Sequence, residues 1–414
     1  MRGVTSTTRA PSAQGSWPVV LCWIAVALDG FDLVVLGAVT PTLLDTKALG
    51  FTPPSLTFVA TIGLVGVGIG AVLIGPIADR LGRRTSLLTA ITVFSVLTLL
   101  IAFAPNVATF ATLRFLAGLG LGACLPTALA FMTEYAPSGT GGTAVTRTMT
   151  GYHVGAVLTA LLALLLVADL GWQVMFVIGG VFGLLSLPFM WAKLPESEAF
   201  LATKRGDANP VPISAVVKGR YLAISLALWV ASFMGLLLVY GLNQWLPTIM
   251  TEAGYSTGAA IGLLLALNLG AVTGLLVAGR ISDSRGNKPT AMAWFGLAAL
   301  FLAGLSIKLE SAAAVYVAVF LAGVFVFSAQ VLVYAFVGHL YPADVRGTAL
   351  GMSAGVGRVG AIVGPFLGGA LVTAGIAYPW GFYIFAIAAV LAVLALSLVP
   401  AHVKDTPPLE RQTA

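Results

Sequence analysis

The stretch GPIADRLGRR, residues 75 to 84, returns later in the chain as GRISDSRGNK, residues 279 to 288. Both stretches fit the pattern G-x-x-x-D-x-x-G-x-[RK], and their matched residues are separated by one constant offset. A weaker pair, EYAPSGTGGTA at 134 to 144 and LYPADVRGTA at 340 to 349, follows the same division. Such internal similarity predicts two halves with the same arrangement of helices.

The composition of this chain is typical of a protein embedded in a lipid bilayer. Hydrophobic residues make up 59% of the 414 residues, charged residues only 9%, and the mean hydropathy is +1.01. One helical span needs about 20 mostly apolar residues. These numbers predict an all-α membrane protein with twelve transmembrane helices in two six-helix halves. We expect the spans near residues 18–43, 56–78, 85–104, 107–134, 144–167, 172–192, 221–250, 257–279, 290–307, 312–340, 346–374 and 380–400.

A polar stretch, KLPESEAFLATKRGDANPVPISAVVKGR, separates the sixth and seventh predicted spans. Basic residues gather in this stretch and in the loops after the second and eighth spans, whereas the opposite loops carry only Lys47 and Lys308. By the positive-inside rule, the basic loops and both termini are predicted to be cytoplasmic. The expected segments are an N-terminal tail at 1–17, a first half at 18–192, a linker at 193–220, a second half at 221–400 and a C-terminal tail at 401–414.

Several classes of function lack support in the sequence. Cys22 and Cys124 lie in apolar runs without metal-ligand spacing, so no metal site or disulfide is expected. There is no P-loop motif, and the G-x-G-x-x-G at 355–360 lies inside a membrane span, without the strand that a dinucleotide site requires. The net charge of +6 follows from membrane topology and predicts no nucleic-acid partner. We therefore expect neither an enzyme nor a cofactor.

Two carboxylates interrupt the first span, in ALDGFDLVVLGAVTPTL at residues 27 to 43. Asp29 and Asp32 are three residues apart and share one face of a helix. At about 1.5 Å per residue they lie roughly 16 and 21 Å into the span, and Arg114 of the fourth span lies at a depth compatible with Asp32. Buried charges in a membrane are costly and mark functional sites. One interpretation is a static interhelical ion pair; the other is proton coupling by Asp29 and Asp32, with Arg114 stabilising the deprotonated form.

A second intramembrane cation, Arg358, lies in SAGVGRVGAIVG, with no acidic residue in its own span. Its guanidinium matches a carboxylate and could anchor an organic acid, or it could cap carbonyls or pair with an aspartate of the first span. His153 lies at a similar depth in the fifth span and is either a substrate ligand or a satisfied interior residue.

An aromatic acid would need ring faces and a few directed hydrogen bonds. The favoured candidates are Asn268, Tyr240, Trp245 and Gln330. Other side chains that could receive a ring are Tyr152, Asn243, Gln244, Phe325, Phe327 and Tyr334.

The repeated loops and the two six-span halves resemble the major facilitator superfamily. A narrower resemblance is to bacterial aromatic acid:proton symporters, carried by DGFD at 29–32, LRFLAGLGLGACLPTALAFMTEYAP, YGLNQWLPTIM, YPADVRGTALG and GRVGAIVGPFLGG. The chain departs from that pattern at two places. After EYAP, where many members have several basic residues, the first basic residue here is Arg147. At His153, an apolar or aromatic residue is expected.

This resemblance implies alternating access around a central substrate site, with the short repeated loops acting as gates. Glu134 and Arg147 could form a gate pair or an ordinary surface pair. The residues expected to gate are Gly75, Asp79, Gly82, Arg83, Arg84, Glu134, Arg147, Asp283, Gly286, Lys288 and Arg346.

The sequence thus predicts a bacterial inner-membrane importer of an aromatic carboxylate, such as benzoate, 4-hydroxybenzoate or gentisate. The membrane potential opposes anion entry by about 2.3 kcal/mol per charge per 100 mV, so uptake requires at least one co-transported proton. The expected partners are the substrate, protons and the lipid bilayer, and the protein is expected to be monomeric. The alternative is an antiporter, or an importer of another organic acid or drug-like molecule, with the same fold.

Overall fold

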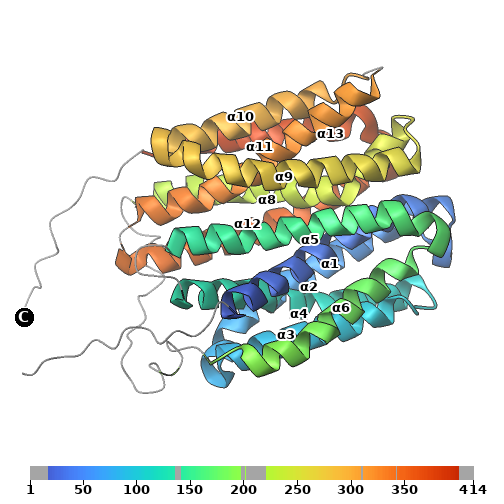
Figure 1. Ribbon diagram of the computed structural model, residues 1–414. Coiled ribbons are helices and arrows are strands. Elements are labelled where there is room, and N and C mark those ends of the chain that lie inside the picture. The colour runs from blue at the N-terminus through green and yellow to red at the C-terminus, as the bar shows by residue number, and fades with distance from the viewer. Residues whose placement is uncertain are drawn as a thin grey trace, which may run out of the picture.

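The chain folds into a bundle of long helices (Figure 1). The computed structural model describes residues 17–135, 141–196, 201, 221–308, 311–341 and 343–400. Within these residues there are twelve α-helices and one 3-10 turn, Ala48–Gly50, and no strand. The helices are α1 (Trp17–Asp45), α2 (Pro53–Leu81), α3 (Arg83–Ile101), α4 (Val107–Tyr135), α5 (Gly141–Leu170), α6 (Gln173–Lys193), α8 (Tyr221–Glu252), α9 (Thr257–Arg285), α10 (Asn287–Gly304), α11 (Ala312–Leu340), α12 (Ala343–Thr373) and α13 (Ala377–Ser397).

The helices confirm the all-α membrane fold that the sequence predicts. Their ends lie within three residues of the predicted spans, except that α9 continues from the predicted end at 279 to Arg285. Eleven of them are long and apolar enough to cross a membrane. The twelfth, α10, is shorter and starts with polar residues, and it packs against α11 and α13. The predicted tails and linker lie almost wholly outside the described residues.

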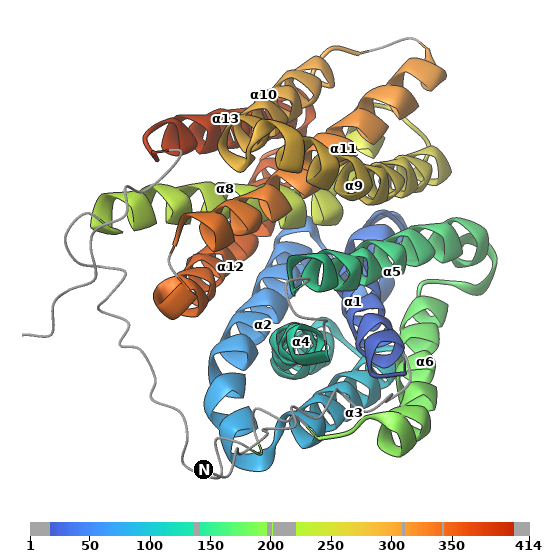
Figure 2. The ribbon, with the colours of Figure 1, turned by 60° about the vertical axis from the view of Figure 1, so that its left-hand side comes forward.

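The two halves repeat one pattern of helix packing. In the first half α2 packs on α4, α1 on α5, and α3 on α4 and α6; in the second half α9 packs on α11, α8 on α12, and α10 on α11 and α13. These pairs correspond under the mapping of α1–α6 onto α8–α13. The contacts between halves obey the same symmetry, because α2 meets α12, α5 meets α9 and α1 meets α8 (Figure 2).

Close helix crossings depend on glycine. A Cβ on Gly30 of α1 would lie 2.0 Å from the carbonyl oxygen of Tyr152, and one on Gly155 of α5 would lie 1.9 Å from that of Ala27. No other residue fits at these two crossings without movement of the helices. Small residues at helix interfaces are typical of membrane bundles, in which lipid provides no hydrophobic force between helices.

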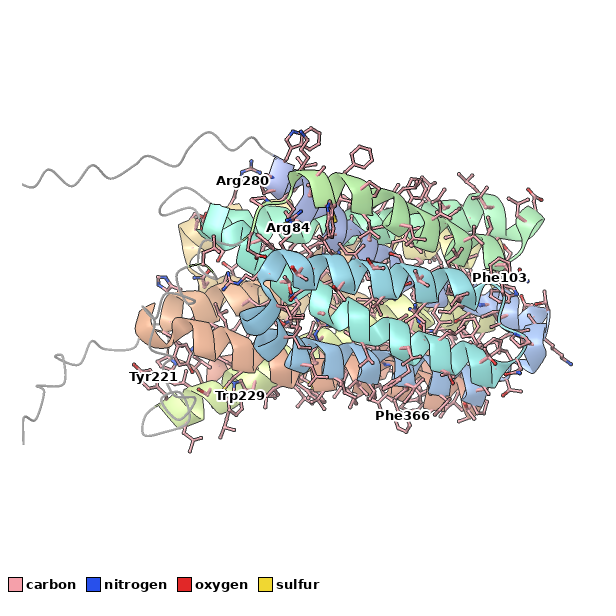
Figure 3. All side chains as sticks on the ribbon, turned by 90° about the horizontal axis from the view of Figure 1, so that it is seen from below. Arg84, Phe103, Tyr221, Trp229, Arg280 and Phe366 are labelled. Atoms are coloured by element: carbon pink, nitrogen blue, oxygen red, sulfur yellow. The ribbon has the colours of Figure 1, made fainter. Side chains whose placement is uncertain are left out.

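Large apolar side chains cover the outer surface of the bundle (Figure 3). Phe103 is 72% exposed, Phe189 64% and Phe366 55%. An apolar surface of this extent is stable in lipid and would aggregate in water. Arg84 and Arg280 both lie toward one end of the bundle, which is the predicted cytoplasmic side, and Phe103 lies at the other end (Figure 3).

Candidate functional site

Asp32 is held in the middle of the first half by polar side chains from two other helices. Its Oδ2 accepts a hydrogen bond from Nη1 of Arg114 in α4 at 2.5 Å, and its Oδ1 accepts one from the Thr98 hydroxyl in α3 at 2.7 Å. Nη2 of Arg114 also donates to the Asp32 backbone carbonyl at 2.6 Å. The predicted Asp32–Arg114 ion pair is therefore present, and both carboxylate oxygens of Asp32 are satisfied.

Asp29 has a different environment. Its side chain is 1% exposed, and Oδ2 has no hydrogen-bond partner among the described residues. The positive charge that acts on it is Arg358 of α12, in the opposite half. A buried carboxylate oxygen without a donor is unfavourable when ionised. The two predicted carboxylates thus divide into one that is fully paired and one that is not.

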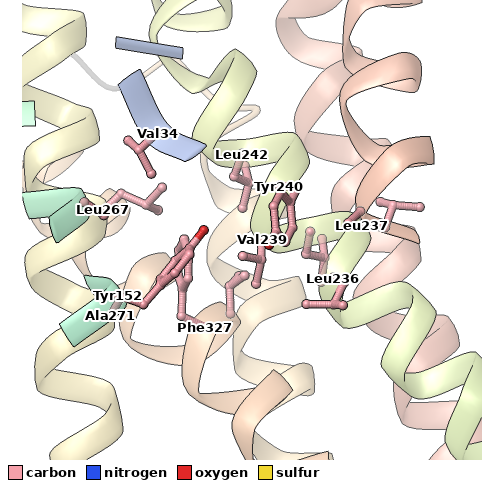
Figure 4. Close-up of a cluster of buried hydrophobic side chains, with 14 of the residues drawn as sticks. Val34, Tyr152, Leu236, Leu237, Val239, Tyr240, Leu242, Leu267, Ala271 and Phe327 are labelled. Atoms are coloured by element: carbon pink, nitrogen blue, oxygen red, sulfur yellow. The ribbon is translucent and has the colours of Figure 1, made fainter. Parts of the chain in front are cut away.

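Arg358 belongs to a chain of polar groups that crosses between the halves. Its Nη1 donates to the Tyr240 hydroxyl of α8 at 2.9 Å, and the hydroxyls of Tyr240 and Tyr152 are hydrogen-bonded to each other. Tyr152 lies on α5 in the first half. Figure 4 shows Tyr152 and Tyr240 among buried apolar side chains of both halves. This chain brings together Asp29, Arg358 and Tyr240, three of the predicted site residues.

A small cavity lies beside this chain. Its volume is about 20 Å³, enough for one water molecule and too small for an aromatic ring. Its polar lining comes from both halves: Arg114, Tyr152, Tyr240, Asn243 and Gln244. This cavity admits no aromatic ring in this conformation.

Four predicted site residues carry a buried polar atom without a hydrogen-bond partner in the described part of the chain: Asp29 Oδ2, His153 Nδ1, Asn268 Oδ1 and Gln330 Oε1. Buried polar atoms are normally satisfied, so each such atom calls for an explanation. They belong to α1, α5, α9 and α11, which are drawn from both halves. Groups of this kind are typical of a site that contacts a ligand.

Asn268, Gln330 and Trp245 do not line the small cavity. Asn268 donates to Asn243 Oδ1 at 3.0 Å, which links it to a cavity residue. Gln330 donates to the Ser232 hydroxyl at 3.3 Å, inside the second half. Trp245 is fully buried between α8 and α12 and donates to the Pro365 carbonyl at 2.7 Å. Its ring packs against Gly368 of α12.

The halves are joined on the predicted external side. Gln244 donates to Thr40 at 3.0 Å, and Thr257 donates to Asp45 Oδ2 at 3.0 Å. Gly37 lies against the backbone of α8, where a Cβ would be 2.1 Å from the Asn243 carbonyl oxygen. These contacts close the external end of the site.

The face of α12 that carries Arg358 diverges from the first half toward the predicted cytoplasmic side. Ile362, one turn further along this face, packs near Gly68 of α2. A Cβ at position 68 would lie 3.8 Å from the Ile362 side chain. Gly355 and Gly351 precede Arg358 on the same face. Both are exposed, and a Cβ at either position would meet no atom within 4 Å in the described part of the chain. Arg358 is therefore the innermost charge on a face that opens toward that side.

The repeated loops form matching links within each half. Arg84 donates to the Trp191 carbonyl at the end of α6 at 2.5 Å, and its guanidinium stacks on the Trp191 ring at 5.3 Å. Lys288, its repeat counterpart, donates to the Ser397 and Val399 carbonyls at the end of α13, at 3.1 and 2.5 Å. Cations at a helix C-terminus are favourable because the last carbonyls are otherwise unsatisfied.

Two glycines turn the chain in these loops. Gly82 and Gly286 have φ values of 91° and 90°, which favour glycine.

Glu196, after α6, accepts a hydrogen bond from the Arg84 backbone N–H at 3.0 Å. Asp283 is exposed on the same side of the bundle, and Arg83 is partly buried. The remaining predicted gate residues have side chains outside the described part: Gly75, Asp79, Glu134, Arg147 and Arg346.

Two residues of the site were not singled out by the sequence pattern. Thr98 donates a hydrogen bond to Asp32, but threonine is common in apolar spans, so the sequence alone does not indicate this role. Tyr152 was only one of many aromatic candidates, although it bonds Tyr240 across the interface. Its position next to His153 was the available signal.

Comparisons with known proteins agree with this architecture. The sequence matches the Major Facilitator Superfamily over residues 22–307 and 257–414. It is 37% identical to the gentisate transporter of Corynebacterium glutamicum, over 92% of this chain and 86% of that protein. It is 35% identical to the gallate transporter of Pseudomonas putida, over 93% and 92%, and 31% identical to the benzoate transport protein of Acinetobacter baylyi, over 92% and 88%.

The solved structures that it resembles have the same fold. A crystal structure of a D-xylose-proton symporter superposes with a TM-score of 0.75 at 19% identity, covering 92% of this chain and 97% of that one. The resemblance to bacterial aromatic acid transporters that the motifs indicate is confirmed by the curated relatives. The chain therefore belongs to the Major Facilitator Superfamily.

Proposed function

We propose that this protein imports an aromatic carboxylate together with a proton, by alternating access between its two halves. The observation that carries the proposal is the buried Asp29 carboxylate, which has an unpartnered oxygen and lies in the electrostatic field of Arg358. Relatives that transport gentisate, gallate and benzoate support an aromatic acid as the substrate.

The coupling follows from competition for one guanidinium. In the absence of substrate, Arg358 compensates the negative charge of Asp29 across the interface. A substrate carboxylate that binds Arg358 removes that compensation, and Asp29 then becomes neutral by taking up a proton. Asp32 keeps its ion pair with Arg114 and its hydrogen bond from Thr98 throughout. Substrate binding and proton uptake are thereby linked at Asp29.

Direction and location follow from charge. The basic loops support a cytoplasmic location for both termini and for the open face of α12, with the joined ends of α1 and α8 outside a bacterial cell. Entry of one anion with one proton is electroneutral, so the membrane potential no longer opposes uptake. The gating residues in the repeated loops act by holding each half rigid while the halves rock.

Substrate uptake by membrane vesicles tests the proposal. Vesicles that contain the protein are given an inward proton gradient and labelled 4-hydroxybenzoate, gentisate or benzoate, with labelled xylose and a cationic dye as comparisons. We expect protein-dependent uptake of an aromatic acid that a protonophore abolishes. Transport of the dye or sugar, with no acid taken up, would favour the antiporter or another importer of this fold.

A further inference from the structure

We propose that His153 recognises a phenolic hydroxyl, so that the substrate is a ring-hydroxylated aromatic carboxylate and His153 selects it over benzoate. This inference rests on the proposed function. It goes further by naming the chemical group that distinguishes the substrate from its simplest analogue, and the residue that binds this group.

His153 is buried and unsatisfied. Its side chain is 3% exposed, and Nδ1 has no hydrogen-bond partner among the described residues. A neutral imidazole has one donor and one acceptor nitrogen, both of which require partners when buried. Phenylalanine would fill the same space without an unsatisfied polar atom. The histidine is therefore a cost to this conformation unless a ligand supplies the missing partner.

The surroundings of His153 are aromatic and lie between the halves. The Phe327 ring, from α11 in the second half, packs edge-on against the imidazole at 5.2 Å, and the Tyr152 ring packs edge-on at 5.1 Å. Figure 4 shows Tyr152 and Phe327 in one cluster of buried side chains that also includes Leu267 and Ala271 of α9. Separation of the halves withdraws Phe327 and uncovers the imidazole next to Tyr152.

The position of His153 relative to Arg358 fits an acid that carries both a carboxylate and a ring hydroxyl. Arg358 bonds Tyr240, Tyr240 bonds Tyr152, and Tyr152 packs on His153. A carboxylate on Arg358, in the second half, therefore directs its ring toward α5 in the first half. A hydroxyl on that ring is a donor at neutral pH, because phenols ionise near pH 10. The imidazole acceptor satisfies it, and benzoate leaves the imidazole unsatisfied.

A site with a buried polar group discriminates strongly against an analogue that cannot pair with it. We expect wild-type protein to prefer 3- or 4-hydroxybenzoate or gentisate over benzoate by at least about tenfold in uptake kcat/KM, the effect of one hydrogen bond. The variant His153→Phe retains the edge-on packing against Phe327 but lacks an acceptor. Its preference for a hydroxylated acid over benzoate is expected to fall to about one.

The test measures labelled-acid exchange in proteoliposomes, because exchange does not depend on a proton gradient. His153→Gln is the rescue variant, since its amide can accept the hydroxyl, and it should recover part of the preference. Phe327→Leu is the packing control and should change the rates for hydroxylated acids and benzoate by the same factor. A His153→Phe variant with unchanged preference, or one that loses both substrates equally, would overturn the assignment. Wild-type protein that exchanges both acids equally would do the same.

A second measurement needs no variant of the site. The chain has only three histidines, so ¹⁵N-histidine NMR resolves each imidazole. Binding of 4-hydroxybenzoate should shift the His153 nitrogen resonances more than benzoate does, and equal shifts contradict the inference. If no aromatic acid is exchanged or bound at all, the proposed function itself fails, and this result is distinguishable from a wrong role for His153.

Discussion

Asp32 and Arg114 form a buried ion pair with a distance of 2.5 Å between Oδ2 and Nη1. Asp29 lies on the same face of α1 as Asp32, but its Oδ2 has no hydrogen-bond partner among the described residues. Removal of one member of a buried pair costs about 3–5 kcal/mol, because the other charge remains buried. Asp32→Asn is therefore expected to lower the thermal stability of the purified protein. The double variant Asp32→Asn/Arg114→Gln should recover much of that stability. If the single variant melts like wild type, the pair is not structural.

Asp29→Asn is expected to lower the melting temperature less than Asp32→Asn does, since Asp29 forms no direct ion pair among the described residues and feels Arg358 only at longer range. It should retain exchange of labelled acid across the membrane, because a neutral side chain resembles the protonated form. It should lose accumulation against a concentration gradient. Exchange and accumulation measured on the same proteoliposomes separate these two outcomes, and full accumulation by the variant contradicts proton coupling at Asp29.

Tyr240 positions Arg358 through a hydrogen bond of 2.9 Å. Tyr240→Phe removes that bond and the link to Tyr152, so KM for the acid should rise roughly threefold to tenfold, equivalent to one hydrogen bond. Arg358→Gln removes the anchor itself and should abolish saturable uptake. Arg358→Lys keeps the charge without the planar fork and is expected to lie between these two variants. A Tyr240→Phe variant more defective than Arg358→Gln would reverse this assignment of roles.

Gly37 controls closure of the predicted external side. A larger side chain there would collide with the Asn243 carbonyl, so Gly37→Val should hold α1 away from α8 and keep the external end open. A cysteine placed at Leu36, which lines the cavity, should then react faster with an impermeant thiol reagent added from outside. Gly258→Val, on the same side with no atom near its Cβ, is the matched control and should not change the reaction rate. Equal rates in the two variants would place the gate elsewhere.

Arg84 and Lys288 test the symmetry of the repeated loops. Each donates to carbonyls at the end of the sixth helix of its half. Arg84→Ala should be the more destabilising change, because it also loses the stacking on Trp191, which contributes about 0.5–1 kcal/mol at an exposed site. Thermal melting of the two alanine variants measures the difference. A larger loss at Lys288 would mean that stacking on Trp191 adds nothing.

Much of the fold could be predicted because each helix coincides with an apolar run of membrane length. The end of α9 could not, since the mostly polar residues 280–285 continue this helix past its apolar run until Gly286 ends it. The Asp32–Arg114 pair could be predicted from helical depth alone. The aromatic part of the site could not be predicted in this way. Since α8 is buried around most of its circumference, the hydrophobic periodicity does not indicate that Tyr240 faces the interface whereas Trp245 faces α12.

Proton movement that accompanies substrate entry tests the role of Asp29. Proteoliposomes with a trapped pH dye are given 4-hydroxybenzoate from outside, and passive acid leak is subtracted with protein-free liposomes. We expect internal acidification that requires the protein and is lost in Asp29→Asn, although that variant still exchanges labelled acid. Equal acidification by Asp29→Asn and wild-type protein would contradict the central claim that Asp29 carries the proton.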